Sequence, residues 1–164
     1  MIFIVSGVKN SGKTTLIEKL IGEFVSRGLR TAVIKHDGHD FEADVPGTDS
    51  WRHQKAGAYG TSIFSPHRYF IYKQQPGVTQ EDMIKAFPEA DVIILEGFKE
   101  LSYTKIEVVR DGNSQKPVCP ADSLAALVTD MEKEQFPDEY SELPVYGLED
   151  IRNITDYILN ILQG

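Results

Sequence analysis

The sequence predicts an α/β fold in which helices cover both faces of a mostly parallel central sheet, with some antiparallel edge strands. Two observations lead to this prediction. Residues 2–5 and 92–95 are continuous apolar runs rich in β-branched side chains, as in strands buried on both faces, and the second run is the middle of a strand pattern over 91–96. A glycine-rich loop, a helix pattern and another strand pattern follow the first run, which favours a parallel pair with a right-handed crossover. The 164 residues suit a single domain spanning positions 1–164.

The first helix is predicted over residues 13–27. Leu16, Leu20 and Phe24 recur at helical spacing on one side, and Gly28 is a suitable stop. The next strand is predicted over residues 30–35, and residues 38–47 are dense in turn-forming types. That loop lies at the carboxyl end of the strand, which is the edge where ligands of open α/β sheets bind.

The remaining elements follow from the same periodicities. Strands are predicted at 59–64 and 69–72, pairing through a turn at 65–68, and another half-buried strand at 105–110. Short apolar runs at 124–128 and 143–146 predict two further strands. Helices are predicted at 49–56, from Thr79 to about Phe87, and over the last apolar stripe from Leu148 to Leu162.

The composition indicates which binding partners and which cellular compartment to expect. Seventeen basic and 25 acidic residues give a net charge of −8, which disfavours sequence-independent binding to nucleic acid. Cys119 is the single cysteine and permits no intramolecular disulfide, so a cytoplasmic location is expected. The first apolar run is too short for a signal peptide, no run reaches membrane-spanning length, and we expect no membrane association.

The strongest motif in the sequence is GVKNSGKT at residues 7–14, which satisfies G-x-x-x-x-G-K-[ST] at every fixed position. It lies between a predicted buried strand and an amphipathic helix, as the P-loop NTPase fold requires. Backbone amides of such a loop and the positive end of the helix dipole bind phosphate oxygens. The predicted nucleotide-binding residues are Gly7, Lys9, Asn10, Ser11, Gly12, Lys13, Thr14 and Thr15.

The same motif predicts a Mg²⁺ site. Lys13 would bridge the β- and γ-phosphates, and the Thr14 hydroxyl would serve the metal ion. A carboxylate is needed at the tip of a neighbouring strand, and both Asp37 and Glu96 follow suitable strand patterns. We therefore predict Lys13, Asp37 and Glu96 as catalytic residues, and Thr14, Asp37 and Glu96 as metal ligands, without choosing between the two carboxylates.

The residues that would recognise the nucleotide base are harder to identify from the sequence. Asp44–Gly47 fits D-x-x-G but follows no apolar strand, so it is read as a loop. Residues 104–107 match N-K-x-D poorly because they lie in a predicted strand. Asp130, at the end of the 124–128 strand pattern, is a better place to read a guanine edge.

Several segments together resemble the molybdopterin-guanine dinucleotide biosynthesis protein B family, MobB. The resemblance covers nearly the whole chain, from the glycine-rich loop to the final helix. Its segments are GVKNSGKTT at 7–15, IKHD at 34–37 with HDF at 39–41, DVPGTDSW at 44–51 with KAGA at 55–58, LEGFK at 95–99, and KIE at 105–107 with Arg110.

This resemblance implies a GTP-binding adaptor with GTP and Mg²⁺ as its ligands. Such a protein assists conversion of molybdopterin to molybdopterin-guanine dinucleotide with the guanylyltransferase of the same pathway, generally as a homodimer. It implies weak GTPase activity at most, and the residues themselves give no side chain that must orient an attacking water.

Two alternatives remain open from the sequence. A small-molecule kinase shares the strand, loop and helix, but it needs a lid that brings cations to the phosphate, and no loop contains two arginines. A metal-insertion GTPase would hold a transition metal at His36 and His39, where His and Asp residues are crowded.

Overall fold

The computed structural model describes residues 1–38, 41–114 and 116–163. Contacts between residues divide the chain into two compact units. The first unit contains residues 1–36 and 84–164, and the second contains residues 37–83. The expected single domain over residues 1–164 stays a prediction, and each unit is described by itself.

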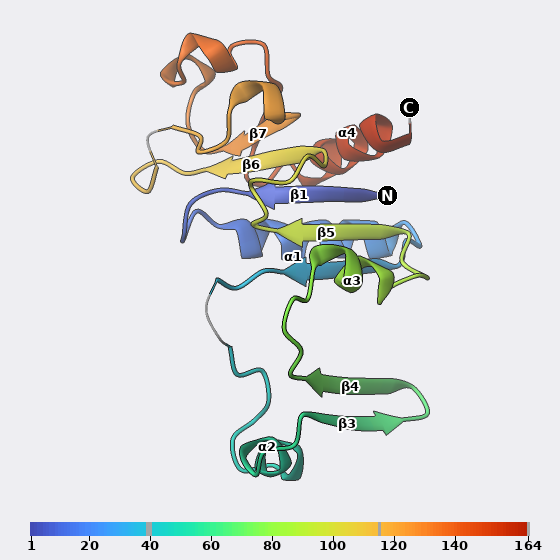
Figure 1. Ribbon diagram of the computed structural model, residues 1–164. Helices are drawn as coiled ribbons and strands as arrows, with labels where there is room; N and C mark the ends of the chain where they lie inside the picture. Colours follow the sequence, from blue (N-terminus) through green and yellow to red (C-terminus); the bar gives the residue numbers. More distant parts are fainter. Residues whose placement is uncertain (39–40, 115, 164) are drawn as a thin grey trace. The chain divides into compact units, whose positions relative to one another are not determined.

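The first unit is built on a six-stranded sheet, and all of its described strand pairs are parallel (Figure 1). The strand order is β2-β5-β1-β6-β7-β8, so the first strand lies inside the sheet, consistent with its apolar sequence. The predicted α/β class is confirmed. The strands are β1 (Ile2–Ser6), β2 (Thr31–Lys35), β5 (Val92–Glu96), β6 (Lys105–Val109), β7 (Ala126–Thr129) and β8 (Val145–Gly147).

Helices α1 (Lys13–Ser26) and α4 (Ile151–Gln163) cover one face of this sheet. Leu16, Leu20 and Phe24 of α1 are buried against the strands, as their spacing predicts. Ile154 and Ile158 of α4 belong to the same apolar cluster. This cluster fixes the axis of α1, whose first residue is the lysine of the glycine-rich loop.

Shorter elements and loops cover the opposite face. One apolar cluster there contains Ile4, Ile34 and Leu95, and the neighbouring cluster contains Leu127 and Phe136. The 3₁₀ helices of this region are η1 (Ala121–Ser123), η2 (Lys133–Gln135) and η3 (Asp138–Tyr140). The helix predicted from Thr79 is α3 (Gln80–Lys85), which includes the boundary between the two units in the sequence. The two faces are therefore covered unequally, with both long helices of the first unit on one side.

Strand β6 differs from its prediction as a half-buried strand, because all five of its residues are buried. It lies between β1 and β7 and is covered on both faces. The alternation in the sequence comes from Lys105 and Glu107, which are only 2% and 1% exposed. Lys105 Nζ donates to the carbonyl oxygen of Lys99, and Glu107 accepts from the amides of Val118 and Cys119.

The second unit contains α2 (Asp49–Lys55), β3 (Gly60–Ser65) and β4 (Arg68–Lys73). The antiparallel pairing of β3 with β4 is confirmed, with Phe64 opposite Tyr69. These strands form a two-stranded sheet of their own and are not edge strands of the six-stranded sheet. Among the described residues, no helix combines the length and apolar character needed to cross a bilayer.

Candidate nucleotide-binding site

The loop between β1 and α1 has a backbone that depends on glycine. Gly7 has φ 138°, and a Cβ there would lie 2.5 Å from the carbonyl oxygen of Val108. Gly12 has φ 96° and immediately precedes α1, and Asn10 also has a positive φ of 63°. The loop consequently reverses the chain from a buried strand into a helix N-terminus, where backbone amides can converge on an anion.

The Lys13 side chain folds back over this loop. Its Nζ donates to the carbonyl oxygens of Gly7 at 3.0 Å and Val8 at 2.7 Å. Burial lowers the pKa of Lys13 below its ordinary value of 10.5, and the nearby Glu96 carboxylate opposes that change. A charged ammonium is thus held at the centre of the loop, where it can exchange carbonyl oxygens for phosphate oxygens.

Thr14 and Glu96, both predicted metal ligands, are brought together by the strand order. Glu96 ends β5, opposite Val5 of the adjacent β1, and its side chain reaches the first turn of α1. The Thr14 hydroxyl donates to Glu96 Oε1 at 3.3 Å. A hydroxyl and a nearly buried carboxylate are hard oxygen donors of the kind that Mg²⁺ prefers, so these two residues fit that ion.

Lys35 is a part of the site that the sequence reasoning missed. It ends β2 and lies directly opposite Glu96 in the parallel register. Its Nζ is 3.4 Å from Glu96 Oε1, the oxygen that also accepts from Thr14. The sequence does place a lysine at the end of the strand that follows the first helix. Its contact with Glu96 cannot be predicted from the sequence, because that contact depends on β2 lying next to β5.

Asp37, the alternative carboxylate, is the first residue of the second unit. Its role as a metal ligand and catalytic residue therefore stays a prediction. The His36 ring lies 5.6 Å from the Phe98 ring, while His39 and Asp40 fall outside the described residues. Within 1–38, 41–114 and 116–163, no group of three or more His, Cys, Asp or Glu side chains could hold a metal ion.

The other predicted loop residues differ in burial. Lys9, Asn10 and Thr15 are exposed, whereas Ser11 is fully buried. The Ser11 hydroxyl has no hydrogen-bond partner in the described part of the chain. The Lys9 carbonyl accepts from Asn113 Nδ2 at 3.2 Å, which ties the loop to the turn after β6.

That turn brings an arginine beside the loop. A Cβ atom added to Gly12 would lie 3.7 Å from Arg110 Nη1. Arg110 Nε lies 3.7 Å from Asp130 Oδ2, and the amide of Asp111 donates to Asp130 Oδ1 at 2.8 Å. Asp130 is therefore attached to the same turn, and its role in reading a guanine edge stays a prediction.

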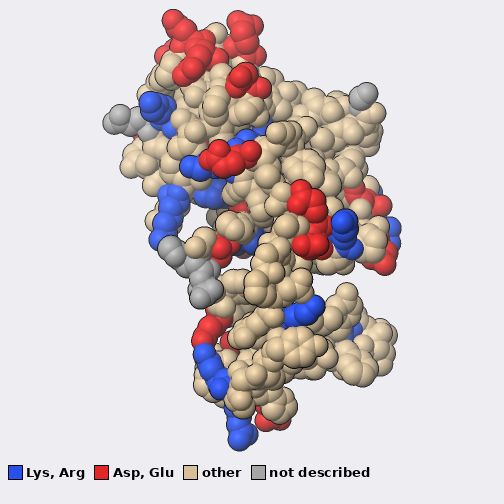
Figure 2. Space-filling model, in the orientation of Figure 1, with Lys and Arg blue, Asp and Glu red and all other residues tan. Residues whose placement is uncertain are grey.

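Charge is unevenly distributed over the first unit. Figure 2 shows acidic side chains gathered at the top of the view, over the segment 132–142. The exposed acidic residues of that segment are Glu132, Glu134, Asp138, Glu139 and Glu142. By contrast, Lys13 and Arg110 lie at or beside the loop after β1. A net negative chain thus places cations where a phosphate would bind.

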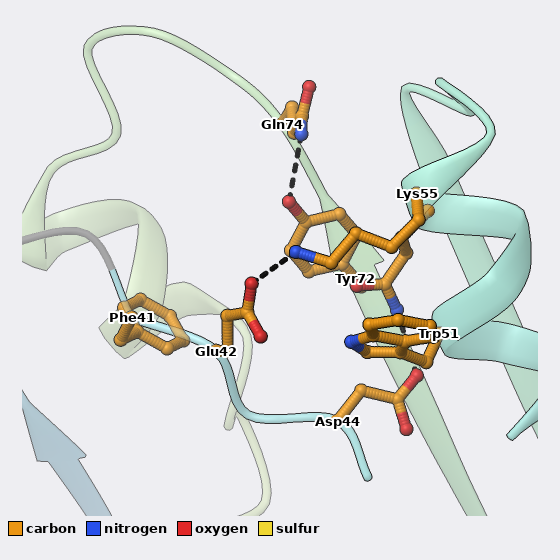
Figure 3. Close-up of a pocket in the computed structure, with 8 residues that line it drawn as sticks. Phe41, Glu42, Asp44, Trp51, Lys55, Tyr72 and Gln74 are labelled. Atoms are coloured by element: carbon orange, nitrogen blue, oxygen red, sulfur yellow. Dashed lines mark hydrogen bonds and ion pairs between the residues drawn. The ribbon is translucent and has the colours of Figure 1, made fainter. Parts of the chain in front are cut away.

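The second unit contains a small pocket of about 90 Å³ (Figure 3). Lys55 spans it, forming an ion pair with Glu42 and lying 5.4 Å from the centre of the Trp51 ring. Asp44 accepts from the amide of Val45 and from Gln54 Nε2 at 2.9 Å. These contacts give Asp44 a structural place in the turn before α2.

Comparisons with known proteins show the family and the fold of this chain. The sequence profile of MobB, molybdopterin guanine dinucleotide synthesis protein B, matches residues 1–130. The molybdopterin-guanine dinucleotide biosynthesis adapter protein of Escherichia coli is 38% identical over 65% of this chain and 64% of that protein. The protein of the same name from Haemophilus influenzae is 32% identical over 97% of this chain and 88% of that protein.

Solved structures give the same fold. The crystal structure of Bacillus subtilis MobB matches with a TM-score of 0.75 and 27% identity, covering 97% of this chain and 96% of that one. A MobB protein homolog from Bacillus stearothermophilus matches with a TM-score of 0.72 at 21% identity, covering 99% and 97%.

Proposed function

Because the chain belongs to the family of MobB, molybdopterin guanine dinucleotide synthesis protein B, we propose that it is a GTP-binding accessory protein of molybdenum cofactor biosynthesis. It assists conversion of molybdopterin to molybdopterin-guanine dinucleotide together with the guanylyltransferase of that pathway. The relatives named adapter proteins in E. coli and H. influenzae support this role. The observation that carries it is the glycine-rich loop with Lys13, Thr14 and Glu96 around it.

Each residue of the loop has a distinct task in nucleotide binding. The amides after Gly7 donate to phosphate oxygens, and Lys13 moves its ammonium from the loop carbonyls to the β- and γ-phosphates. Thr14 and Glu96 would hold Mg²⁺, which neutralises phosphate charge when bound. Arg110 adds a further cation beside Gly12.

We propose at most weak GTP hydrolysis. Charge neutralisation by Lys13 lowers part of the barrier, but the attacking water must also be positioned. Among the described contacts around the loop, the Glu96 carboxylate is engaged by Thr14 and Lys35, and the Asp130 carboxylate is engaged by Arg110 and the amide of Asp111. A partner protein or a second subunit can complete the site.

We also propose that the protein is a homodimer and acts in the cytoplasm. One face of the β3-β4 sheet carries Phe64, Tyr69 and Ile71, which are 83%, 72% and 63% exposed. A two-stranded sheet is only marginally stable alone, and such an apolar face is typical of an interface. The second copy of the chain is the proposed occupant.

The proposed function predicts Mg²⁺-dependent binding of GTP in preference to ATP, measured by calorimetry. Lys13→Ala should weaken GTP binding about 10- to 100-fold, since it removes charge-assisted hydrogen bonds to phosphate. Lys19→Ala is the matched control, because Lys19 lies on the same helix but pairs with exposed Glu149.

Co-purification with the tagged protein tests the adaptor role. GTP-loaded wild-type protein should retain the guanylyltransferase, and Lys13→Ala should retain less. Equal affinity for GTP and ATP, or unaltered GTP binding by Lys13→Ala, would contradict nucleotide recognition at this loop. Steady phosphoryl transfer to a small molecule would favour the kinase alternative.

A further inference from the structure

The carboxylate of Glu96 has two neighbours at one oxygen atom. Oε1 accepts from the Thr14 hydroxyl at 3.3 Å and lies 3.4 Å from Lys35 Nζ. The Glu96 side chain is only 10% exposed, whereas that of Lys35 is 59% exposed. A nearly buried carboxylate needs a compensating charge, and in the described chain Lys35 forms its ion pair.

The charge of Lys13 also favours the Glu96 carboxylate, but among the described residues Lys13 forms no ion pair with it. Its ammonium donates to the carbonyl oxygens of Gly7 and Val8, which are on the loop side of the site. Lys35 approaches Glu96 from the other side, because β2 pairs with β5 and places the two residues opposite each other. The two lysines therefore have separate positions around one carboxylate.

Lys35 is also poorly placed to bind the phosphates directly. Strand β5 lies between β2 and β1 in the sheet. Neighbouring strands are about 4.8 Å apart, so the backbone of Lys35 is roughly 10 Å from the strand that leads into the loop. From there, its ammonium reaches the carboxylate at the tip of β5, at 3.4 Å.

We propose that Lys35 competes with Mg²⁺ for Glu96 and thereby sets the Mg²⁺ concentration at which the protein binds GTP. The Thr14 hydroxyl and the Lys35 ammonium already occupy the two lone-pair positions of Oε1, so a metal ion bound at that oxygen must displace one of them, and its charge repels the ammonium. This inference rests on the proposed function, because it concerns the same nucleotide site.

The competition gives the Lys35→Met variant two effects of opposite sign. Without Mg²⁺, Glu96 loses its counter-charge and repels the triphosphate, so GTP binds more weakly than in the wild type. In a Mg²⁺ titration, the midpoint falls about two- to fivefold, as expected for an ion pair whose lysine side chain is 59% exposed. At saturating Mg²⁺ the GTP affinities of the two proteins agree within about twofold.

The test is binding of a fluorescent GTP analogue, measured in EDTA and across a Mg²⁺ titration. Arg30→Met is the matched control, because Arg30 forms an ion pair with Asp91 at the opposite end of the same two strands, also at 3.4 Å. The Arg30→Met variant also removes one positive charge, and it should change neither the GTP affinity in EDTA nor the midpoint of the Mg²⁺ titration. Lys35→Arg keeps the cation and should restore most of the wild-type midpoint.

The outcomes separate this inference from the proposed function. Weaker GTP binding by Lys35→Met at every Mg²⁺ concentration would make Lys35 a phosphate ligand and overturn the competition. An unchanged Mg²⁺ midpoint, or an equal shift in Arg30→Met, would also overturn it. If wild-type protein bound no GTP at any Mg²⁺ concentration, the proposed function would fail, and this inference with it.

Discussion

Gly7 and Lys13 show how single residues build the phosphate loop. Gly7 is required because a side chain at its φ of 138° would collide with the Val108 carbonyl, which belongs to the neighbouring strand. Lys13 donates to two carbonyl oxygens that the same turn directs inward. Phosphate binding therefore exchanges one set of acceptors for another, and the measured affinity reports the difference between them.

The lowered pKa of Lys13 predicts a pH dependence of GTP binding. The charged ammonium attracts the triphosphate, so binding raises the pKa and favours proton uptake. GTP affinity should therefore fall as the pH rises through the lowered pKa, beginning before the ordinary value of 10.5. The same shift makes the folded chain lose this proton first, so the contribution of Lys13 to stability rises with pH in that window.

Calorimetric titrations from neutral to alkaline pH measure this effect. The guanine base also titrates at alkaline pH, so Lys13→Arg supplies the reference, since arginine stays charged throughout. The wild type should lose affinity relative to Lys13→Arg as the pH rises. A constant ratio between the two proteins over that range would rule out the linkage to Lys13.

At the scale of elements, the sequence predicts most of the fold because its patterns are local. Continuous apolar runs identify β1 and β5, and helical spacing identifies the buried side of α1. Strand β6 was expected to be half-buried because Lys105 and Glu107 resemble solvent-facing positions. Their burial depends on backbone partners at Lys99, Val118 and Cys119, which only the folded chain brings close.

In the candidate site, too, the local features can be predicted from the sequence and the long-range contacts cannot. The loop residues are contiguous, so a motif identifies them. The contact of Lys35 with Glu96 spans two strands that are far apart in the sequence, and it depends on the strand order β2-β5-β1. Sequence reasoning offered both Glu96 and Asp37 as strand-end carboxylates, and the structure brings Glu96 to Thr14.

The burial of Glu107 predicts a large effect on stability. Its Oε1 and Oε2 accept from the amides of Val118 at 2.6 Å and Cys119 at 2.9 Å. Glu107→Ala leaves two amides without their acceptor and should lower the free energy of unfolding by about 2–4 kcal/mol. Glu107→Gln keeps one carbonyl oxygen and should cost less.

Urea unfolding followed by circular dichroism measures this change. Glu149→Ala is the control, because the Glu149 side chain is 84% exposed and its ion pair with Lys19 should contribute about 1 kcal/mol or less. Equal stabilities for the Glu107 and Glu149 variants would mean that the two amides find other acceptors.

For the whole molecule, the exposed face of the β3-β4 sheet predicts how a homodimer is held together. Phe64 and Tyr69 lie directly opposite each other on that face, and both are more than two-thirds exposed. Burying them against a second copy removes apolar surface from water, at about 25 cal/mol per Å². Introducing a charge there makes that burial unfavourable.

The double variant Phe64→Asp with Tyr69→Asp should therefore be a monomer in sedimentation-velocity experiments, while the wild type sediments as a dimer. Val25→Asp is the control, since Val25 is 58% exposed on α1 and lies in the other unit. Because the nucleotide loop is in the first unit, GTP binding by the monomeric variant then reports whether one chain forms the site alone. Retained affinity assigns all phosphate contacts to one chain, whereas lost affinity in a folded monomer means that the second copy contributes a residue. A wild type that sediments as a monomer at all concentrations would contradict the dimer.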